Sequence, residues 1–245
     1  MVYTIYMYLS VIIPAYNEEK RIGSTLKSID EYLGRQSYDY EILVVSDGSH
    51  DNTVSLVRGF EQSIRGLRLI DSKENHGKGY VVKQGMLEAK GELRLFTDAD
   101  NSTSIDHLDI FIPHISHGYS IIIGSIGISG HKVASGSEPA WRRVLGKLGN
   151  LFIQIMAVPG IQDTQRGFKL FTADAVSKIF PKLTITRWGF DIEVLALARK
   201  FGYKIKELPV DWKNDPNSKV GLKAYFQVLL ETVKIRFNLM MGQYN

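Results

Sequence analysis

The first hundred residues alternate short, almost continuous apolar runs with longer segments whose apolar residues recur every three or four positions. Continuous runs are typical of strands buried on both faces, and the longer period is typical of amphipathic helices. The predicted strands are residues 9–14, 41–46, 67–70 and 93–97, and the predicted helices are residues 17–33, residues from 51 onward and a segment ending near residue 89. This order predicts βαβ units and a parallel sheet.

The pattern changes after residue 100. Strands are predicted at residues 119–124, 167–172 and 203–211, and helices at residues 140–157, 173–180, about 190–201 and 222–237. Pro209 has no N–H for a central ladder, so the last strand is expected at a sheet edge. Loops are predicted at residues 127–138 and 214–221. The expected fold class is α/β, with a mostly parallel central sheet, flanking helices and a C-terminal elaboration, in one domain of residues 1–245.

Two carboxylates, Asp98 and Asp100, follow the predicted strand at residues 93–97. Residues i and i+2 of a strand project to the same side, so a bend here aims both side chains at one point. Hard oxygen ligands of this kind suit Mg²⁺ or Mn²⁺, which commonly keeps waters and binds substrate phosphates. A solvated turn with an Asx cap is the alternative, because a D-x-D pattern alone has low specificity.

Three loops are expected at the carboxyl ends of the parallel strands, where ligands bind in open α/β sheets. They are residues 14–18, 47–49 and 98–103. Stacking by Tyr16 and hydrogen bonding by Asp47 suit a nucleoside, although Asp47 fits an ordinary Asp-Gly turn about as well. Gly77, Lys78 and Gly79 at a predicted helix start offer backbone donors and a cation to a diphosphate. Their spacing matches neither a P-loop nor a dinucleotide fingerprint.

Composition narrows the function classes. The chain has no Cys, which excludes disulfides, thiolate metal sites and Cys nucleophiles. Residues 1–122 hold 12 Lys and Arg against 17 Asp and Glu (−5), and residues 123–245 hold 18 against 9 (+9), which sum to the net +4. The acidic half suits metal and nucleotide handling and the basic half an anionic partner, with uneven solvated charge as the alternative. No apolar run is long enough to span a bilayer, residues 1–9 do not fit a signal peptide, and no motif supports nucleic-acid binding.

Four motifs occur together in the order and spacing of one known family: residues 11–18 (VIIPAYNE), 45–49 (VSDGS), 75–79 (NHGKG) and 97–100 (TDAD). Together they resemble the inverting glycosyltransferases of family two, which have the Rossmann-like GT-A fold. Residues 163–171 (DTQRGFKLF) and 188–193 (WGFDIE) resemble motifs of the dolichyl-phosphate β-glucosyltransferase, or polyprenyl-phosphate hexosyltransferase, branch. The resemblance covers residues 8 to 215.

The resemblance implies an enzyme, a hexosyltransferase that moves glucose from UDP-glucose, with GDP-mannose as the alternative donor, onto a polyprenyl phosphate. It places the nucleotide sugar and metal in residues 1–122 and the acceptor in residues 123–245. It assigns Asp98, Asp100 and Gln165 to an Mg²⁺ or Mn²⁺ ion, with a plain polar strand end as the alternative for Gln165. The implied nucleotide-sugar contacts are Pro14, Tyr16, Asn17, Glu18, Asp47, Lys78, Gly79, Asp98 and Ala99.

The acceptor decides which further residues are needed. A phosphate monoester is already anionic near pH 7 (second pKa about 6), so it needs cations and no general base. The candidate contacts are Arg142, Arg143 and Arg166, with Lys147 and Lys169 as further cations of the basic half. A hydroxyl acceptor would need a carboxylate, for which Asp163 is the candidate, with capping or salt-bridging as its alternative role. Transfer to a sugar or protein hydroxyl, and a catalytically inactive sugar-nucleotide-binding scaffold, stay open.

Two features bear on the acceptor and the membrane. Relatives carry an Arg where this chain has Ile126, so one expected phosphate contact is missing. The last predicted helix has an apolar stripe of Leu222, Phe226, Leu229, Val233 and Phe237 beside Lys223, Lys234 and Arg236. The stripe fits a membrane surface, or the core as its commoner fate. Relatives have an N-terminal anchor that we do not expect here, so membrane contact is expected to be peripheral, on the cytoplasmic face.

Overall fold

A computed structural model describes residues 7–130, 140–213 and 222–244. Most of the loop predicted at residues 127–138 lies outside this part of the chain, and so do the loop predicted at residues 214–221 and residues 1–6. The same holds for the side chains of Arg142, Arg143, Lys147 and Leu222.

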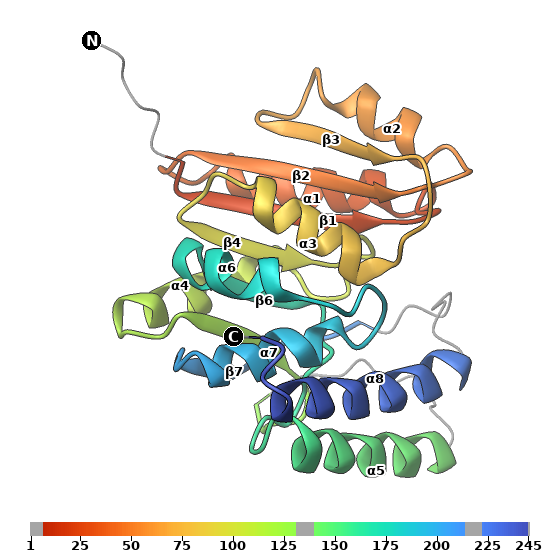
Figure 1. The fold of residues 1–245 in the computed structure, drawn as a ribbon. Coiled ribbons are helices and arrows are strands. Elements are labelled where there is room, and N and C mark those ends of the chain that lie inside the picture. Colours follow the sequence, from red (N-terminus) through yellow and green to blue (C-terminus); the bar gives the residue numbers. More distant parts are fainter. Residues whose placement is uncertain (1–6, 131–139, 214–221, 245) are drawn as a thin grey trace.

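In the described residues, seven strands form one sheet in the order β3-β2-β1-β4-β6-β5-β7 (Figure 1). All neighbouring pairs are parallel except the two made by β6. The strands are β1 (Leu9–Ala15), β2 (Tyr40–Asp47), β3 (Leu67–Ser72), β4 (Leu93–Thr97), β5 (Ile121–Ser125), β6 (Phe168–Thr172) and β7 (Ile205–Pro209). The predicted mostly parallel sheet is confirmed, and the strand that ends at Pro209 lies at an edge, as expected.

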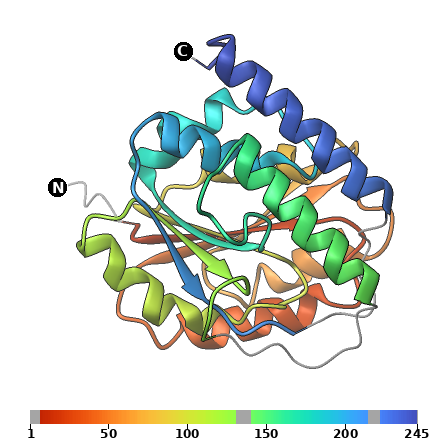
Figure 2. The same cartoon turned by 90° about the horizontal axis from the view of Figure 1, so that it is seen from below.

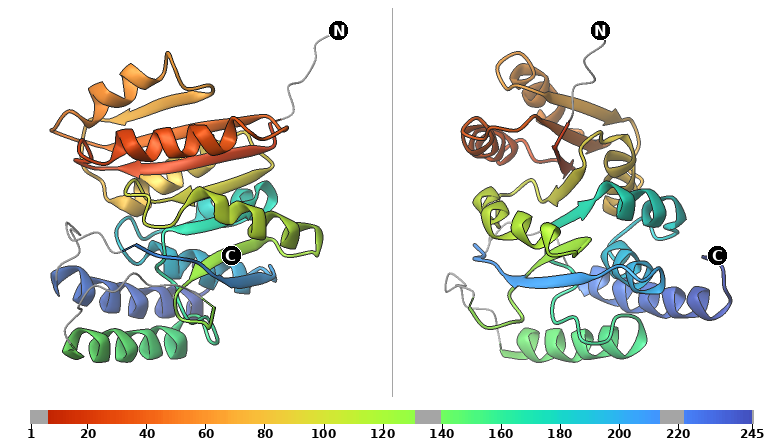
Figure 3. Two further views of the ribbon diagram at one scale, coloured as in Figure 1. Left: turned by 180° about the vertical axis from the view of Figure 1, so that it is seen from behind. Right: turned by 90° about the vertical axis from the view of Figure 1, so that its left-hand side faces the viewer.

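Helices cover both faces of the sheet, as the edge-on view of Figure 3 shows. One face packs on α1 (Ile22–Leu33), α2 (Thr53–Phe60) and α4 (Leu108–Ser116), the last preceded by a 3₁₀ turn, η1 (Ile105–His107). The other packs on α3 (Lys78–Glu88), α6 (Ala173–Ile179) and α7 (Phe190–Lys200), with the turn η2 (Phe180–Lys182) after α6. Each face therefore has its own apolar core, and every residue of β1 and β2 is buried between them.

The first helix begins later than the sequence pattern predicts. Residues 17–21 form a loop, because Asn17 has a left-handed backbone (φ 54°) and the Glu18 N–H donates to Thr53 Oγ1 at 2.7 Å. The Asn17 N–H also donates to Ser49 Oγ, at 3.1 Å. These bonds tie the loop after β1 to the loop after β2, so α1 starts only at Ile22.

Two long helices, α5 (Ala140–Met156) and α8 (Leu222–Met240), lie side by side outside α7 (Figure 2). For the apolar stripe predicted on the last helix, packing against the core was the favoured alternative. This prediction is wrong for α8. The helix buries Ala224, Val228 and Ile235, while Phe226 and Phe237 of the predicted stripe are exposed. The buried positions form a second stripe at helical spacing, and that stripe faces the core.

Candidate active site

The carboxyl ends of three adjacent parallel strands bring the predicted carboxylates to one edge of the sheet. β1 pairs with β2 on one side and with β4 on the other. Asp47 is the last residue of β2, and Asp98 and Asp100 follow the end of β4. The same edge carries the loop after β1, with Tyr16, so the predicted grouping of these loops is confirmed. Ligands bind in such a position in open α/β sheets.

The Asp98 carboxylate is paired with a cation. Its Oδ1 lies 2.6 Å from Lys78 Nζ, at the first position of α3. Desolvation lowers the pKa of Lys78, but the nearby Asp98, Asp191 and Asp100 carboxylates outweigh it, and the pKa is raised. Lys78 therefore stays protonated, a permanent positive charge against the first carboxylate of the D-x-D pair.

The Asp100 carboxylate caps the turn that follows it. Its Oδ1 accepts the Ser102 N–H at 2.9 Å, and Asn101 between them has a left-handed backbone (φ 52°). The capping alternative for this residue is thus real. The other carboxylate oxygen of Asp100 has no hydrogen bond in that turn. This oxygen can therefore serve as a ligand for a cation.

A glycine allows the second half of the chain to approach Asp98. A Cβ on Gly167 would lie 1.9 Å from Asp98 Oδ2, and the Gly167 carbonyl accepts the Asp98 N–H at 3.1 Å. Gln165, two residues earlier, donates from Nε2 to the Trp188 carbonyl at 3.5 Å. The structure thus brings the segment that carries Gln165 beside the D-x-D pair, while the amide group contacts Trp188, two residues before α7 begins.

Asp47 faces the loop that precedes α3. Its carboxylate accepts the N–H groups of His76 at 2.8 Å and Gly77 at 3.0 Å, and Asn75 Nδ2 donates to its carbonyl at 3.1 Å. Burial raises the pKa of Asp47, against the lowering effect of those N–H groups and of His76 and Arg187. The role of Asp47 in this state is to fix the loop that presents Lys78.

The remaining predicted nucleotide-sugar residues belong to β1, the loop after it, the turn after β4 and α3. Pro14 is part of β1, and the Tyr16 ring lies 6.4 Å from that of His50. Glu18 pairs with Arg21, and the Ala99 carbonyl accepts a hydrogen bond from Thr25 Oγ1 at 2.7 Å. Gly79 is needed for packing, since a Cβ there would lie 2.7 Å from that of Phe190.

On the predicted acceptor side, Asp163 is bound by two donors. Its Oδ2 accepts from Arg166 Nε at 3.1 Å and from the Ile126 N–H at 3.2 Å. The Arg166 guanidinium lies 4.7 Å from the Trp212 ring centroid. Asp163 therefore has the salt-bridging role that was the alternative to a general base.

Sequence reasoning missed a buried ion pair beside the site. Lys169 Nζ lies 2.6 Å from Asp191 Oδ1, and both side chains are almost fully buried. Lys169 is thus not an acceptor cation. Burial raises the pKa of Asp191 against the lowering effect of Lys169 and Lys78. An acidic residue in the first turn of a predicted helix was the available signal, but it indicates a cap equally well.

The donor set fits a hard divalent cation. Asp98 and Asp100 supply only carboxylate oxygens, the ligands that Mg²⁺ and Mn²⁺ prefer, and such ions commonly take further ligands from water and phosphates. Among the described residues, no three His, Asp or Glu side chains gather closely enough to hold an ion alone. Any ion here would therefore complete its coordination with other groups.

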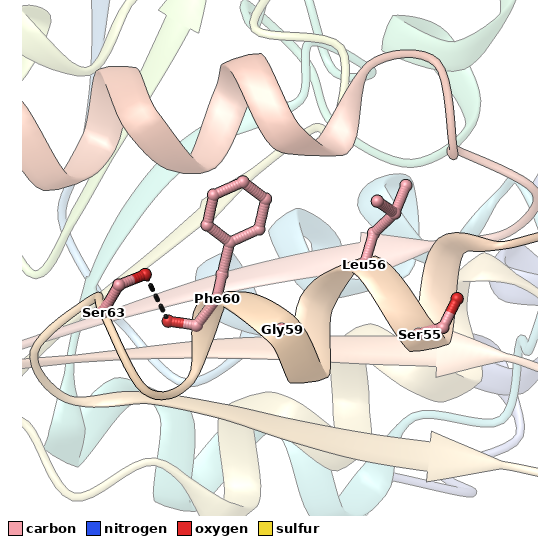
Figure 4. Close-up of a pocket in the computed structure, with 5 residues that line it drawn as sticks. All are labelled: Ser55, Leu56, Gly59, Phe60 and Ser63. Carbon is pink, nitrogen blue, oxygen red and sulfur yellow. Dashed lines mark hydrogen bonds between the residues drawn. The ribbon is translucent and has the colours of Figure 1, made fainter.

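A separate surface hollow of about 340 Å³ lies along α2. Figure 4 shows Leu56 and Phe60 pointing from α2 toward α1, with Ser55, Gly59 and Ser63 beside them. The hollow has no charged side chain in its lining, so it offers nothing to a diphosphate or a metal ion.

The glycosyl transferase family 2 model matches residues 10–180. The chain belongs to this family. A dolichyl-phosphate β-glucosyltransferase of Dictyostelium discoideum is 37% identical over 251 residues, covering 96% of this chain and 76% of the relative. Proteins of the same name are 37% identical in Drosophila melanogaster (86% and 69% covered) and 32% identical in Homo sapiens (96% and 76%).

Solved structures show the fold of this family 2 member. Glucosyl-3-phosphoglycerate synthase of Mycobacterium tuberculosis has a TM-score of 0.70 at 16% identity, covering 96% of this chain and 81% of that one. Mannosyl-3-phosphoglycerate synthase of Rubrobacter xylanophilus has a TM-score of 0.67 at 15% identity, covering 97% and 76%. These likenesses confirm the predicted GT-A fold.

Proposed function

We propose that this protein transfers glucose from UDP-glucose to a polyprenyl phosphate of the dolichyl type, with inversion at the anomeric carbon. One observation carries the proposal: Asp47, Lys78, Asp98 and Asp100 converge at the ligand-binding edge of the sheet. Relatives named dolichyl-phosphate β-glucosyltransferase match nearly the whole chain at 32–37% identity, which supports this donor and acceptor.

The donor is held at the carboxyl edge of β1, β2 and β4. Tyr16 and Asp47 contact the nucleoside. The Lys78 ammonium group exchanges its contact with Asp98 for a contact with the diphosphate. Asp98 and Asp100 would hold an Mg²⁺ or Mn²⁺ ion, with Gln165 as a further oxygen ligand. When bound, the ion neutralises charge on the departing nucleoside diphosphate. The proximity of Lys78 to Asp98, at 2.6 Å, supports this placement of the diphosphate.

The acceptor attacks from the face opposite the diphosphate. An oxygen of the lipid phosphate forms the new bond to the anomeric carbon as the bond from that carbon to the UDP oxygen breaks, and no proton needs to leave. Arg142, Arg143 and Arg166 position this phosphate. The pairing of Asp163 with Arg166 supports a phosphate acceptor, because it leaves Asp163 poorly placed to take a proton from a hydroxyl. Residues 1–122 thus serve mainly the donor and residues 123–245 the acceptor.

A lipid acceptor requires the protein to act at a membrane surface. We propose that the protein binds peripherally to the cytoplasmic face of that membrane. The test offers a panel of radiolabelled nucleotide sugars, including UDP-glucose, GDP-mannose and UDP-N-acetylglucosamine, with polyprenyl phosphate in vesicles and Mg²⁺ or Mn²⁺. The expected result is label from UDP-glucose in the organic phase. Label from GDP-mannose instead would overturn the donor, and label only in water-soluble products would overturn the acceptor.

A further inference from the structure

The outward sides of α5 and α8 carry apolar side chains that the active site does not use. Six of them, each between 54% and 72% exposed, define an outer apolar surface: Leu148, Leu151, Ile155, Phe226, Leu230 and Phe237. Soluble proteins rarely expose so many large apolar side chains together unless they meet a partner.

The six side chains form one stripe on each of two helices that contact each other. They recur at spacings of three, four and seven residues, so each helix contributes a single stripe. The opposite sides are packed: a Cβ on Gly149 of α5 would lie 2.4 Å from the Tyr225 hydroxyl of α8, and Val228 and Ile235 of α8 are buried. Figure 2 shows the two helices side by side in front of the sheet.

The charged residues of α5 and α8 are almost all basic. Glu231 is the single acidic residue of the two helices, and its Oε2 turns inward to accept the Gly189 N–H at 2.6 Å. The basic residues of the two helices are Arg142, Arg143, Lys147, Lys223, Lys234 and Arg236. Ordinary solvent-exposed surfaces mix both signs. An apolar stripe flanked by cations is the composition of a helix that lies in the headgroup region of a bilayer.

We propose that the outer apolar surface docks on a phospholipid membrane, with α5 and α8 lying in its plane. This rests on the proposed function, which needs access to a lipid phosphate. Both helices begin on the side where β1, β2 and β4 end (Figure 1), so the catalytic edge and the first turns of the docking helices lie on the same side of the molecule. Among the described residues, none of the helices combines the length and apolar content needed to cross a bilayer.

The docking helix is also fastened to the active site. Glu231 of α8 binds the N–H of Gly189, and the neighbouring Trp188 ring lies 5.8 Å from Lys78 Nζ. These contacts link α8, through Gly189 and Trp188, to Lys78 at the D-x-D edge.

Flotation with vesicles of phosphatidylcholine and phosphatidylserine tests the surface. The variant Leu230→Glu/Phe237→Glu places two charges in the stripe, and Leu87→Glu/Ile110→Glu on α3 and α4 is the matched control, since those two side chains are also partly exposed. The wild type and the control should float. The partition coefficient of the stripe variant between vesicles and water should fall by about tenfold or more. The proposal would be overturned if both variants float as well as the wild type, or if both lose flotation to the same extent.

Activity separates docking from catalysis. The stripe variant should lose about tenfold or more activity on polyprenyl phosphate in vesicles, yet stay within about twofold on a short, water-soluble prenyl phosphate. Equal loss on both acceptors would contradict a docking role. The surface would instead bind a second copy of the chain if three results were found together. The wild type would sediment as a dimer, the stripe variant would sediment as a monomer, and neither would float with vesicles. If the wild type glucosylates neither acceptor, the proposed function fails while flotation still decides the surface.

Discussion

At the residue scale, Gly167 controls the position of Asp98. The space that its missing Cβ leaves is filled by the Asp98 carboxylate. We expect Gly167→Ala to displace that carboxylate and to lower kcat/KM about a hundredfold, because a shift of about 1 Å costs that much in a well-aligned site. Steady-state transfer assays measure the effect.

Gly146→Ala is the matched control for this substitution. Nothing lies within 4 Å of a Cβ at Gly146, in the first half of α5. Alanine there should leave activity unchanged and should stabilise the helix by about 0.5–1 kcal/mol. Equal activity of the two variants would contradict the role given to Gly167.

The buried pair of Lys169 and Asp191 makes a prediction about stability. Lys169→Met removes the cation that pairs with the buried Asp191 carboxylate, and should lower the free energy of unfolding by about 3–5 kcal/mol. Lys169→Met/Asp191→Leu should cost less than either single change, since neither charge then remains. Urea unfolding of the three variants measures this, and additive losses would show that the two side chains do not act as a pair.

Individual residues differ in how far the sequence predicts them. Asp47, Asp98 and Asp100 were predicted at one edge, because each follows a recognisable strand and parallel strands end together. The pairing of Lys78 with Asp98 was not predicted, because it depends on how α3 packs against β4. Asp191 was missed for the same reason, since its partner Lys169 arrives on the antiparallel strand β6.

At the element scale, α8 shows why periodicity alone misassigns a face. The helix has two stripes, and its buried one includes Thr232 and Asn238, which look polar in the sequence. Both are satisfied locally: Thr232 Oγ1 donates to the Val228 carbonyl at 2.8 Å and Asn238 Nδ2 to the Tyr244 hydroxyl at 3.2 Å. A buried polar group with a partner costs little, so the polar Thr232 and Asn238 can belong to the buried stripe.

The chain end beyond α8 is fastened to α7 by Tyr244, whose hydroxyl donates to the buried Glu193 carboxylate at 2.6 Å. Burial and this bond raise the pKa of Tyr244 to about 12. The folded protein then binds the phenolic proton more tightly than the unfolded chain, so this stability is full below pH 10 and is lost as the pH rises through about 12.

Tyr244→Phe should therefore destabilise the protein at pH 8, and its deficit should shrink as the pH rises toward 11.5. Two pKa units correspond to about 2.7 kcal/mol, which bounds the change. Denaturant unfolding at several pH values measures it, with the partly exposed Tyr80→Phe as the control. A deficit that is constant with pH would contradict the Tyr244–Glu193 contact.

At the scale of the whole molecule, the two halves of the chain build one site. β6 inserts antiparallel between β4 and β5, so Gly167 and Lys169 from the basic half lie beside Asp98 from the acidic half. The sequence predicted the mostly parallel sheet but not this insertion, because short apolar runs do not show their direction. The assignment of residues 1–122 to the donor and 123–245 to the acceptor stays a prediction.

The proposed binding of a divalent cation by Asp98 and Asp100 is tested most directly by the rate at which label passes from UDP-glucose to polyprenyl phosphate. This rate is compared for the wild type and for Asp100→Asn at saturating Mg²⁺ or Mn²⁺. The Asn side chain keeps the turn cap through its amide oxygen but removes the negative charge that attracts a divalent cation. We predict a folded variant whose transfer rate falls at least about a hundredfold. Undiminished transfer by Asp100→Asn would contradict the proposed role of Asp100 as a ligand of the cation.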